Sequence, residues 1–223
     1  VAETLRLVAP RLPDETTLIG FAGAPWTVAT YMVEGSGSRD HPTIKQWAFS
    51  DPQGFGKLMD LLVQGTAAYL KAQIAAGAEA VQLFDTWAGA LPHAYLEPLV
   101  FQPLQQIAAL IHDEYPDIPV IGFPRGIGTS LAHAARIPGI AGLSIDWSMD
   151  PQWVAANVQP HRVVQGNLDP RLVVVGGEPM REATRHILDC FGHRNFIFNL
   201  GHGFVPETPP EHVGELSEML KGV

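Results

Sequence analysis

Four polar side chains lie at or just beyond the ends of short apolar runs, and their types suit contacts with a polar substrate. Thr86, Arg125 and His202 each follow such a run, and Tyr31 follows the loop after an earlier one. Hydroxyl and imidazole groups exchange hydrogen bonds, and the arginine fork binds carboxylates. Each residue also has a structural interpretation: a packed tyrosine, a turn threonine, a rim salt bridge and a turn histidine. Spacing alone leaves both interpretations open.

Three acidic residues and two tryptophans accompany these side chains. We expect Asp85, Asp146 and Asp169 to act in loops and helix caps rather than as catalytic acids. Trp87 and Trp147 could line an apolar wall, but core packing is the interpretation we favour.

The elements that must position these residues alternate between short apolar runs and longer helical patterns. Runs this short and this continuously apolar are typical of parallel strands buried on both faces. The six runs are 18–22, 80–84, 119–123, 142–145, 163–166 and 195–200.

Most helices carry a recognisable start, in which an acidic residue precedes a proline at the first helical position. Gly77 is expected to close the helix that follows Pro52. Pro103 is expected to divide the segment 96–115 into a short turn and a longer helix. The starts are Asp51-Pro52, Asp150-Pro151, Asp169-Pro170, the weaker Glu178-Pro179, and a capping box over 208–211 with Pro209 first in its helix.

Six strand–helix units in a row predict an α/β fold with parallel strands, either a doubly wound sheet or a (β/α)₈ barrel. The sequence G-F-A-G-A-P after the first strand is not the dinucleotide fingerprint of the doubly wound class. Polar residues at the end of every strand favour the barrel, which has eight strands. We therefore predict a single domain, residues 1–223, forming a partial TIM barrel of about six strands. Two units would be missing at the N-terminus, where the chain also lacks a Met.

Several long motifs occur together in this order: G-F-A-G-A-P-W-T-V-A-T-Y-M-V-E-G-S-G-S over 20–38, L-F-D-T-W-A-G over 83–89, Q-G-N-L-D-P over 165–170, N-L-G-H-G over 199–203 and P-E-T-P-P-E over 206–211. With these motifs the chain resembles the C-terminal two-thirds of the uroporphyrinogen decarboxylase family. The resemblance implies loss of carbon dioxide from the four acetate side chains of a cyclic tetrapyrrole, uroporphyrinogen III, to give coproporphyrinogen III in haem biosynthesis.

The resemblance also implies roles for individual residues. Tyr31 would be catalytic, donating its hydroxyl to the substrate or to a family aspartate that this chain does not contain. Thr86 stands where the family commonly has serine and would contact a substrate carboxylate, and His202 would bind substrate at the pocket floor. Arg125 is the remaining candidate for substrate binding, since a polycarboxylate needs cations. The protonated pyrrole ring serves as the electron sink, so the resemblance implies no cofactor and no metal.

Composition excludes several other classes. The formal charge of −9 and the lack of a Lys/Arg stripe argue against nucleic acid, and no apolar run is long enough to span a membrane. The single cysteine, Cys190, permits no internal disulfide and suits a reducing cytoplasm. A homodimer is implied by the resemblance alone.

Three alternatives stay open. One is a cobalamin- or thiol-dependent methyltransferase of the same barrel superfamily, which would hold zinc through Cys and His. We expect Cys190 in the helix before the last strand, away from the polar rim, which argues against this class. The others are a non-catalytic folded fragment and a sugar-phosphate enzyme with a glycine-rich phosphate cradle. Because the family's arginines and aspartate are not in this sequence, we expect the chain alone to be nearly inactive.

Overall fold

The computed structural model describes residues 1–35, 40–192 and 195–221. The chain divides into two compact units, 1–143 and 144–223, and each is described by itself.

The strands of the described residues are parallel and follow one another in the sheet in chain order. They are β1 (Ile19–Gly23), β2 (Ala80–Asp85), β3 (Val120–Pro124), β4 (Gly142–Ser144), β5 (Val163–Leu168) and β6 (Phe196–Leu200). All six predicted runs are therefore strands, with ends displaced by two residues at most. The parallel order with helices between the strands confirms an α/β fold of the TIM-barrel family.

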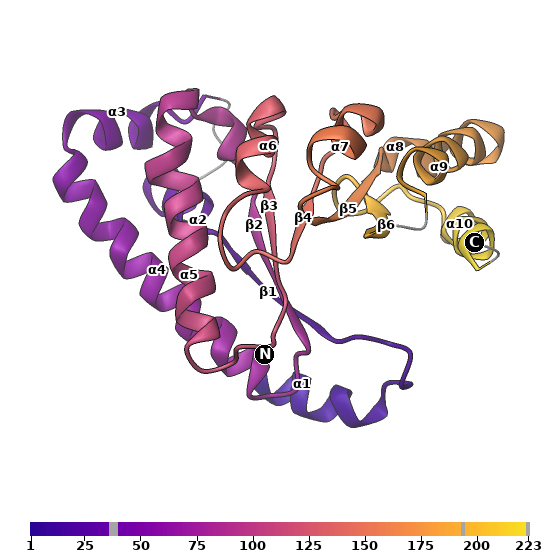
Figure 1. Ribbon diagram of the computed structural model, residues 1–223, viewed down its shortest axis with the longest axis horizontal. Helices are drawn as coiled ribbons and strands as arrows, with labels where there is room; N and C mark the ends of the chain where they lie inside the picture. Colours follow the sequence, from indigo (N-terminus) through magenta and orange to yellow (C-terminus); the bar gives the residue numbers. More distant parts are fainter. Residues whose placement is uncertain (36–39, 193–194, 222–223) are drawn as a thin grey trace. The chain divides into compact units, whose positions relative to one another are not determined.

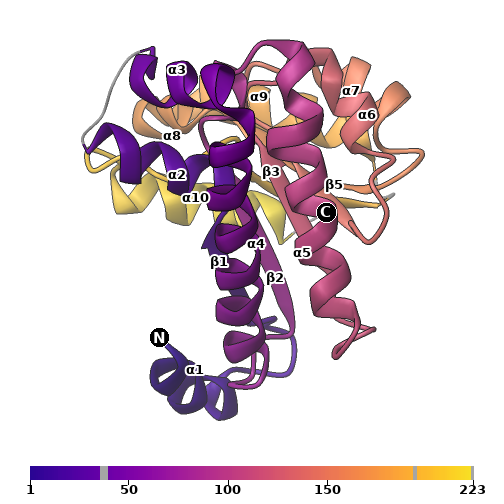
Figure 2. The ribbon, with the colours of Figure 1, turned by 90° about the vertical axis from the view of Figure 1, so that its left-hand side faces the viewer.

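In the first unit, long helices cover one face of the strands. Figures 1 and 2 show α4 (Pro52–Ile74) and α5 (Gln102–His112) side by side against this face. The predicted cap of α4 is confirmed, because the Asp51 carboxylate accepts a hydrogen bond of 2.9 Å from the amide of Gly54. Gly77 lies in the turn just after α4, where its φ of 111° favours glycine.

The remaining elements of the first unit are short. A π-helical turn, η4 (Glu97–Phe101), precedes α5 and places Pro103 in the first turn of that helix, so the predicted division is confirmed. The others are α1 (Ala2–Val8), η1 (Ala9–Arg11), α2 (Pro25–Glu34), α3 (Pro42–Ser50), η2 (Ala88–Ala90), η3 (His93–Tyr95), η5 (Gly128–Ser130) and α6 (Leu131–Ala134).

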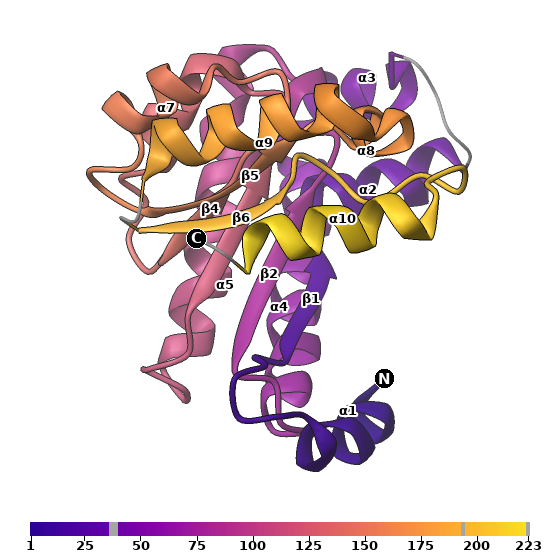
Figure 3. The same cartoon turned by 90° about the vertical axis from the view of Figure 1, so that its right-hand side faces the viewer.

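The second unit pairs β5 with β6, as Figure 3 shows, and its described residues also form four helices. These are α7 (Pro151–Asn157), α8 (Pro170–Val175), α9 (Gly177–Phe191) and α10 (Pro210–Leu220). Asp150 and Asp169 cap α7 and α8, each accepting a hydrogen bond from the amide two residues later, as the sequence predicts.

Two predicted helix starts are wrong. Helix α10 begins at Pro210 rather than Pro209, and its N-cap makes no side-chain hydrogen bond. The Thr208 hydroxyl is buried without a hydrogen-bond partner in the described part of the chain, so the capping box does not form. Helix α9 begins at Gly177, which places Glu178 inside its first turn instead of before it.

None of the helices in the described residues is both long and apolar enough to cross a bilayer.

Candidate functional site

In the first unit, a buried carboxyl group lies at the end of β2. Asp85 is only 4% exposed and accepts a hydrogen bond of 2.5 Å from the hydroxyl of Thr27, in the first turn of α2. The same hydroxyl accepts a bond of 3.2 Å from the amide of Trp87. The strand end and the helix start are thus joined through two side-chain oxygens.

Burial raises the pKa of Asp85 to about 7, and the hydrogen bonds from the hydroxyl and amide of Thr27 oppose that rise. Water is removed from around the carboxylate, so the charged form loses hydration that two donors only partly replace. The prediction that Asp85 lies in a loop is therefore wrong, because it is the last residue of a strand. The predicted cap role is confirmed, but the helix residue whose amide donates to it, Thr27, lies 58 residues away in sequence.

Tyr31 stands one helical turn after Thr27 on α2, with 54% of its surface exposed. Its ring packs edge-on against Trp87, with 6.2 Å between centroids. His41 contacts the same indole at 4.7 Å. Trp87 therefore contacts Tyr31 of the candidate site. The sequence analysis favours core packing alone for this tryptophan.

Thr86 and Arg125 lie next to Asp85 and Trp87. Thr86 is half-buried in the turn between Asp85 and Trp87. Arg125 directly follows β3, and its amide donates to the carbonyl of Asp85 over 3.1 Å. The ends of β2 and β3 therefore place both residues on the same edge of the sheet as Asp85.

In the second unit, the ends of the strands carry a separate polar group. Asp146 accepts hydrogen bonds from the amide and hydroxyl of Ser148, which confirms its predicted loop role. The buried side chain of Asn167 donates to the carbonyls of Asp146 and Met149 over 3.1 and 2.9 Å. These bonds tie the end of β5 to the loop after β4.

His202 follows β6 and is exposed, with its ring 6.4 Å from that of Trp147. The preceding glycine allows this approach, because a Cβ at Gly201 would collide with the backbone nitrogen of Trp147. Glycine at this position therefore has a steric reason independent of any substrate.

The structure brings Tyr31, Thr86 and Arg125 to one edge of the first unit and His202 to the strand ends of the second. That all four converge on one cleft stays a prediction. Ser36–Ser38, which end the first long motif, lie outside the described residues.

Sequence reasoning missed Asp85 as a member of this group. The available signal was an acidic residue that ends a run of buried apolar residues, since such a carboxylate needs hydrogen-bond donors from elsewhere in the fold.

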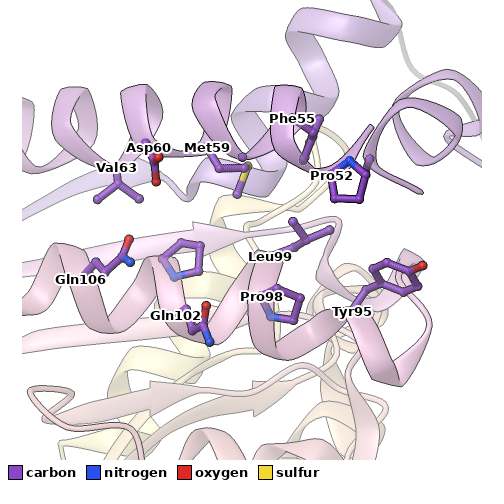
Figure 4. Close-up of a pocket in the computed structure, with 13 residues that line it drawn as sticks. Pro52, Phe55, Met59, Asp60, Val63, Tyr95, Pro98, Leu99, Gln102 and Gln106 are labelled. Atoms are coloured by element: carbon purple, nitrogen blue, oxygen red, sulfur yellow. The ribbon is translucent and has the colours of Figure 1, made fainter. Parts of the chain in front are cut away.

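A separate hollow of about 250 Å³ lies between α4 and the segment from η3 to α5, as Figure 4 shows. Phe55, Met59 and Leu99 give it an apolar lining, and Asp60, Gln102 and Gln106 add polar groups.

Cys190 lies near the end of α9, as the sequence predicts, and its sulfur is 3.7 Å from His186 Nε2. Burial raises the pKa of its thiol, and the nearby carboxylates of Asp150 and Asp189 raise it further. A zinc ligand must be a thiolate, and the raised pKa makes the thiolate of Cys190 harder to form. Within the described ranges, no group of three or more His, Cys, Asp or Glu side chains is arranged to hold a metal ion.

Solved structures define the class of fold. A methyltransferase from Methanosarcina mazei superposes with a TM-score of 0.81 at 17% identity, over 97% of this chain and 62% of its own. A B12-independent methionine synthase from Shewanella gives a TM-score of 0.64 at 9% identity, over 99% and 66%. At such identities the likeness concerns the fold alone.

The family comes from sequence. The family model for uroporphyrinogen decarboxylase (URO-D) matches residues 1–223, so the chain belongs to that family. Proteins called uroporphyrinogen decarboxylase are 49% identical in Rhodospirillum rubrum, over 99% of this chain, and 47% identical in Paracoccus denitrificans, over all of it. The chain spans 64% and 65% of the lengths of these two relatives.

Proposed function

We propose that the full-length gene product containing this chain removes carbon dioxide from the four acetate side chains of uroporphyrinogen III, giving coproporphyrinogen III. The observation that carries the proposal is the family match over all 223 residues. The grouping of Tyr31, Thr86 and Arg125 at one sheet edge is consistent with it.

The chemistry requires an electron sink and a proton source. Protonation of a pyrrole ring gives a cation, which accepts the electron pair of the breaking carbon–carbon bond as carbon dioxide leaves. The exocyclic carbon then takes a proton to become a methyl group, and the ring loses its added proton. Each acetate is thus exchanged for a methyl group and one carbon dioxide without any redox change, so the reaction itself requires no cofactor.

Each candidate residue has a part in this proposal. Tyr31 donates its hydroxyl beside the reacting ring, Thr86 and Arg125 bind substrate carboxylates, and His202 forms a hydrogen bond with the tetrapyrrole. Removing one donor that acts in the transition state costs roughly 10²-fold in kcat. We therefore expect Tyr31→Phe to lower kcat by about this factor with a smaller change in KM.

The decisive experiment measures coproporphyrinogen formation by the full-length gene product after dialysis against a chelator. Undiminished turnover supports cofactor-free decarboxylation. Loss of activity that added zinc restores would favour a metal-dependent enzyme. A product that accepts no tetrapyrrole at all, with or without metal, would refute the proposal.

The 223-residue chain by itself is expected to be nearly inactive. The substrate carries eight carboxylates and the chain a formal charge of −9. Among the four candidate residues, Arg125 alone carries a permanent positive charge. Desolvating unpaired carboxylates costs several kcal/mol each, so binding by this chain should be weak. Turnover equal to that of the full-length product would contradict this.

The proposed enzyme is a cytoplasmic homodimer. The single cysteine suits a reducing compartment. Light scattering of the full-length product at micromolar concentration measures the assembly, and a monomeric mass would contradict the dimer.

A further inference from the structure

The first turn of α2 rests on the end of β2 through hydrogen bonds between distant parts of the chain. The amide of Ala24 donates to the carbonyl of Phe84 over 2.9 Å. The indole nitrogen of Trp26 donates to the carbonyl of Trp87 over 3.0 Å. These two contacts fix the backbone of the helix start against residues 84–87.

Asp85 and Thr27 add side-chain hydrogen bonds to this junction, by which we mean the contact between the first turn of α2 and residues 84–87. The carboxylate accepts from both the hydroxyl and the amide of Thr27, and the hydroxyl in turn accepts from the amide of Trp87. Asp85 and Thr27 are each only 4% exposed, so water does not replace these bonds. The carboxylate therefore holds both sides of the junction.

Helix α2 depends on this arrangement because its own start supplies no cap. Its N-cap residue is Ala24, which makes no side-chain hydrogen bond, and Pro25 follows as the first helical residue. A helix N-terminus favours a negative group and needs acceptors for its first amides. Asp85 supplies an acceptor from another element.

The residues of the proposed site lie on the two sides of this junction. Tyr31 is four residues after Thr27, hence on the same face of α2, and its ring packs on Trp87. Thr86 lies between Asp85 and Trp87 on the strand side. A change at the junction would shift the tyrosine relative to the threonine.

We propose that Asp85 is a positioning residue: through Thr27 it fixes the first turn of α2 on the end of β2, and so sets the placement of Tyr31 relative to Thr86. The inference rests on the proposed function for its effect on turnover. A serine or aspartate at position 24 could cap the helix without burying a carboxyl group. A residue on β2, by contrast, caps α2 and at the same time helps to fix its distance from Thr86.

The experiment compares variants of the full-length gene product. Asp85→Leu removes the acceptor and Asp85→Asn retains an oxygen for the Thr27 hydroxyl. Asp51→Ala removes the cap of α4 and serves as the control for a lost helix cap elsewhere. We expect Asp85→Leu to lower kcat by roughly tenfold or more, because misplacement of a reacting group acts mainly on the transition state. Asp85→Asn should restore most of this loss, and Asp51→Ala should leave kcat within about twofold while lowering stability.

A double-mutant cycle distinguishes positioning from general destabilisation. If Asp85 acts through Tyr31, the loss from Asp85→Leu and the loss from Tyr31→Phe are not additive in the double variant. Additive losses, or a wild-type kcat in Asp85→Leu, would overturn the proposal. Thr27→Val, which removes only the bridging hydroxyl, repeats the test should Asp85→Leu fail to fold.

Hydrogen exchange of the amides at 24–31 provides a readout that needs no activity. We expect Asp85→Leu to lose protection there and Asp85→Asn to keep it. Unchanged protection in Asp85→Leu would show that the carboxylate does not fix α2, whatever the activity. A full-length product without decarboxylase activity but with the expected exchange pattern would refute the proposed function and leave the junction itself confirmed.

Discussion

Two buried aspartates at strand ends differ in what surrounds them. Asp146 is bonded within its own turn, by Ser148 two residues later. Asp85 instead relies on Thr27 of another element, and burial raises its pKa to about 7. A local turn can be predicted from the sequence around it, whereas a partner 58 residues away cannot, because it exists only once the strand and helix have met.

The raised pKa of Asp85 predicts an unusual pH dependence of stability. Between the ordinary aspartate pKa of 3.8 and the raised pKa of about 7, the folded chain holds a proton on this group that the unfolded chain has lost. The free energy of unfolding therefore falls as pH rises through this window, by about 4 kcal/mol in total from this group. This loss of stability is absent below about pH 4 and complete above about pH 7.

Asp85→Asn removes this titration and keeps the side-chain volume. The expected result is that the variant gains stability relative to wild type as pH rises from 4 to 7, with no further change above pH 8. Urea unfolding at a series of pH values measures the difference. Taking the difference cancels the titration of all other groups, unless the substitution alters it. A difference independent of pH would contradict the raised pKa.

At the scale of elements, one side chain of α4 holds the edge strand β1. The buried amide of Gln73 donates to the carbonyl of Phe21 and accepts from its amide, over 2.9 and 3.0 Å. It thus replaces the backbone partner that a neighbouring strand would give. Gln73→Leu leaves two backbone groups unpaired, so we expect a loss of roughly 1–3 kcal/mol in the free energy of unfolding.

Gln64, exposed on the same helix, provides the matched control. Gln64→Leu should change the unfolding free energy by less than about 0.5 kcal/mol. Equal effects of the two substitutions in chemical denaturation would show that the Gln73 hydrogen bonds contribute nothing measurable.

The sequence predicts most elements because their signals are local. A continuous apolar run bounded by turn residues identifies a buried strand, and Asp51, Asp150 and Asp169 cap their helices as expected. The start of α10 is ambiguous by contrast, since Pro209 and Pro210 both suit a first helical position. The hydrogen bonds of Gln73 and of Asp85 join residues more than 50 positions apart, so no local pattern in the sequence predicts them.

At the scale of the whole molecule, strand β4 links the two units through the chain. Gly142 and Leu143 pair with β3 in the first unit. The amide of Ile145, just beyond β4, donates to the carbonyl of Gln165 on β5 over 2.8 Å in the second. A segment of four residues thus has backbone partners on both sides, and unfolding either unit would leave it with partners on one side only.

The prediction of a single domain over residues 1–223 implies one cooperative unfolding transition. Each unit can be followed separately. Trp147→Phe with Trp153→Phe leaves tryptophan only in the first unit, and a fluorophore on Cys190 reports on the second. In one doubly substituted, labelled protein we expect the two signals to give the same urea midpoint. The reason is that unfolding of either unit removes the backbone partners of the 142–145 segment on one of its two sides. The unlabelled protein, followed by circular dichroism, serves as the control for the label. Two separate midpoints would mean that the units fold independently, and the chain would then comprise two domains joined at β4.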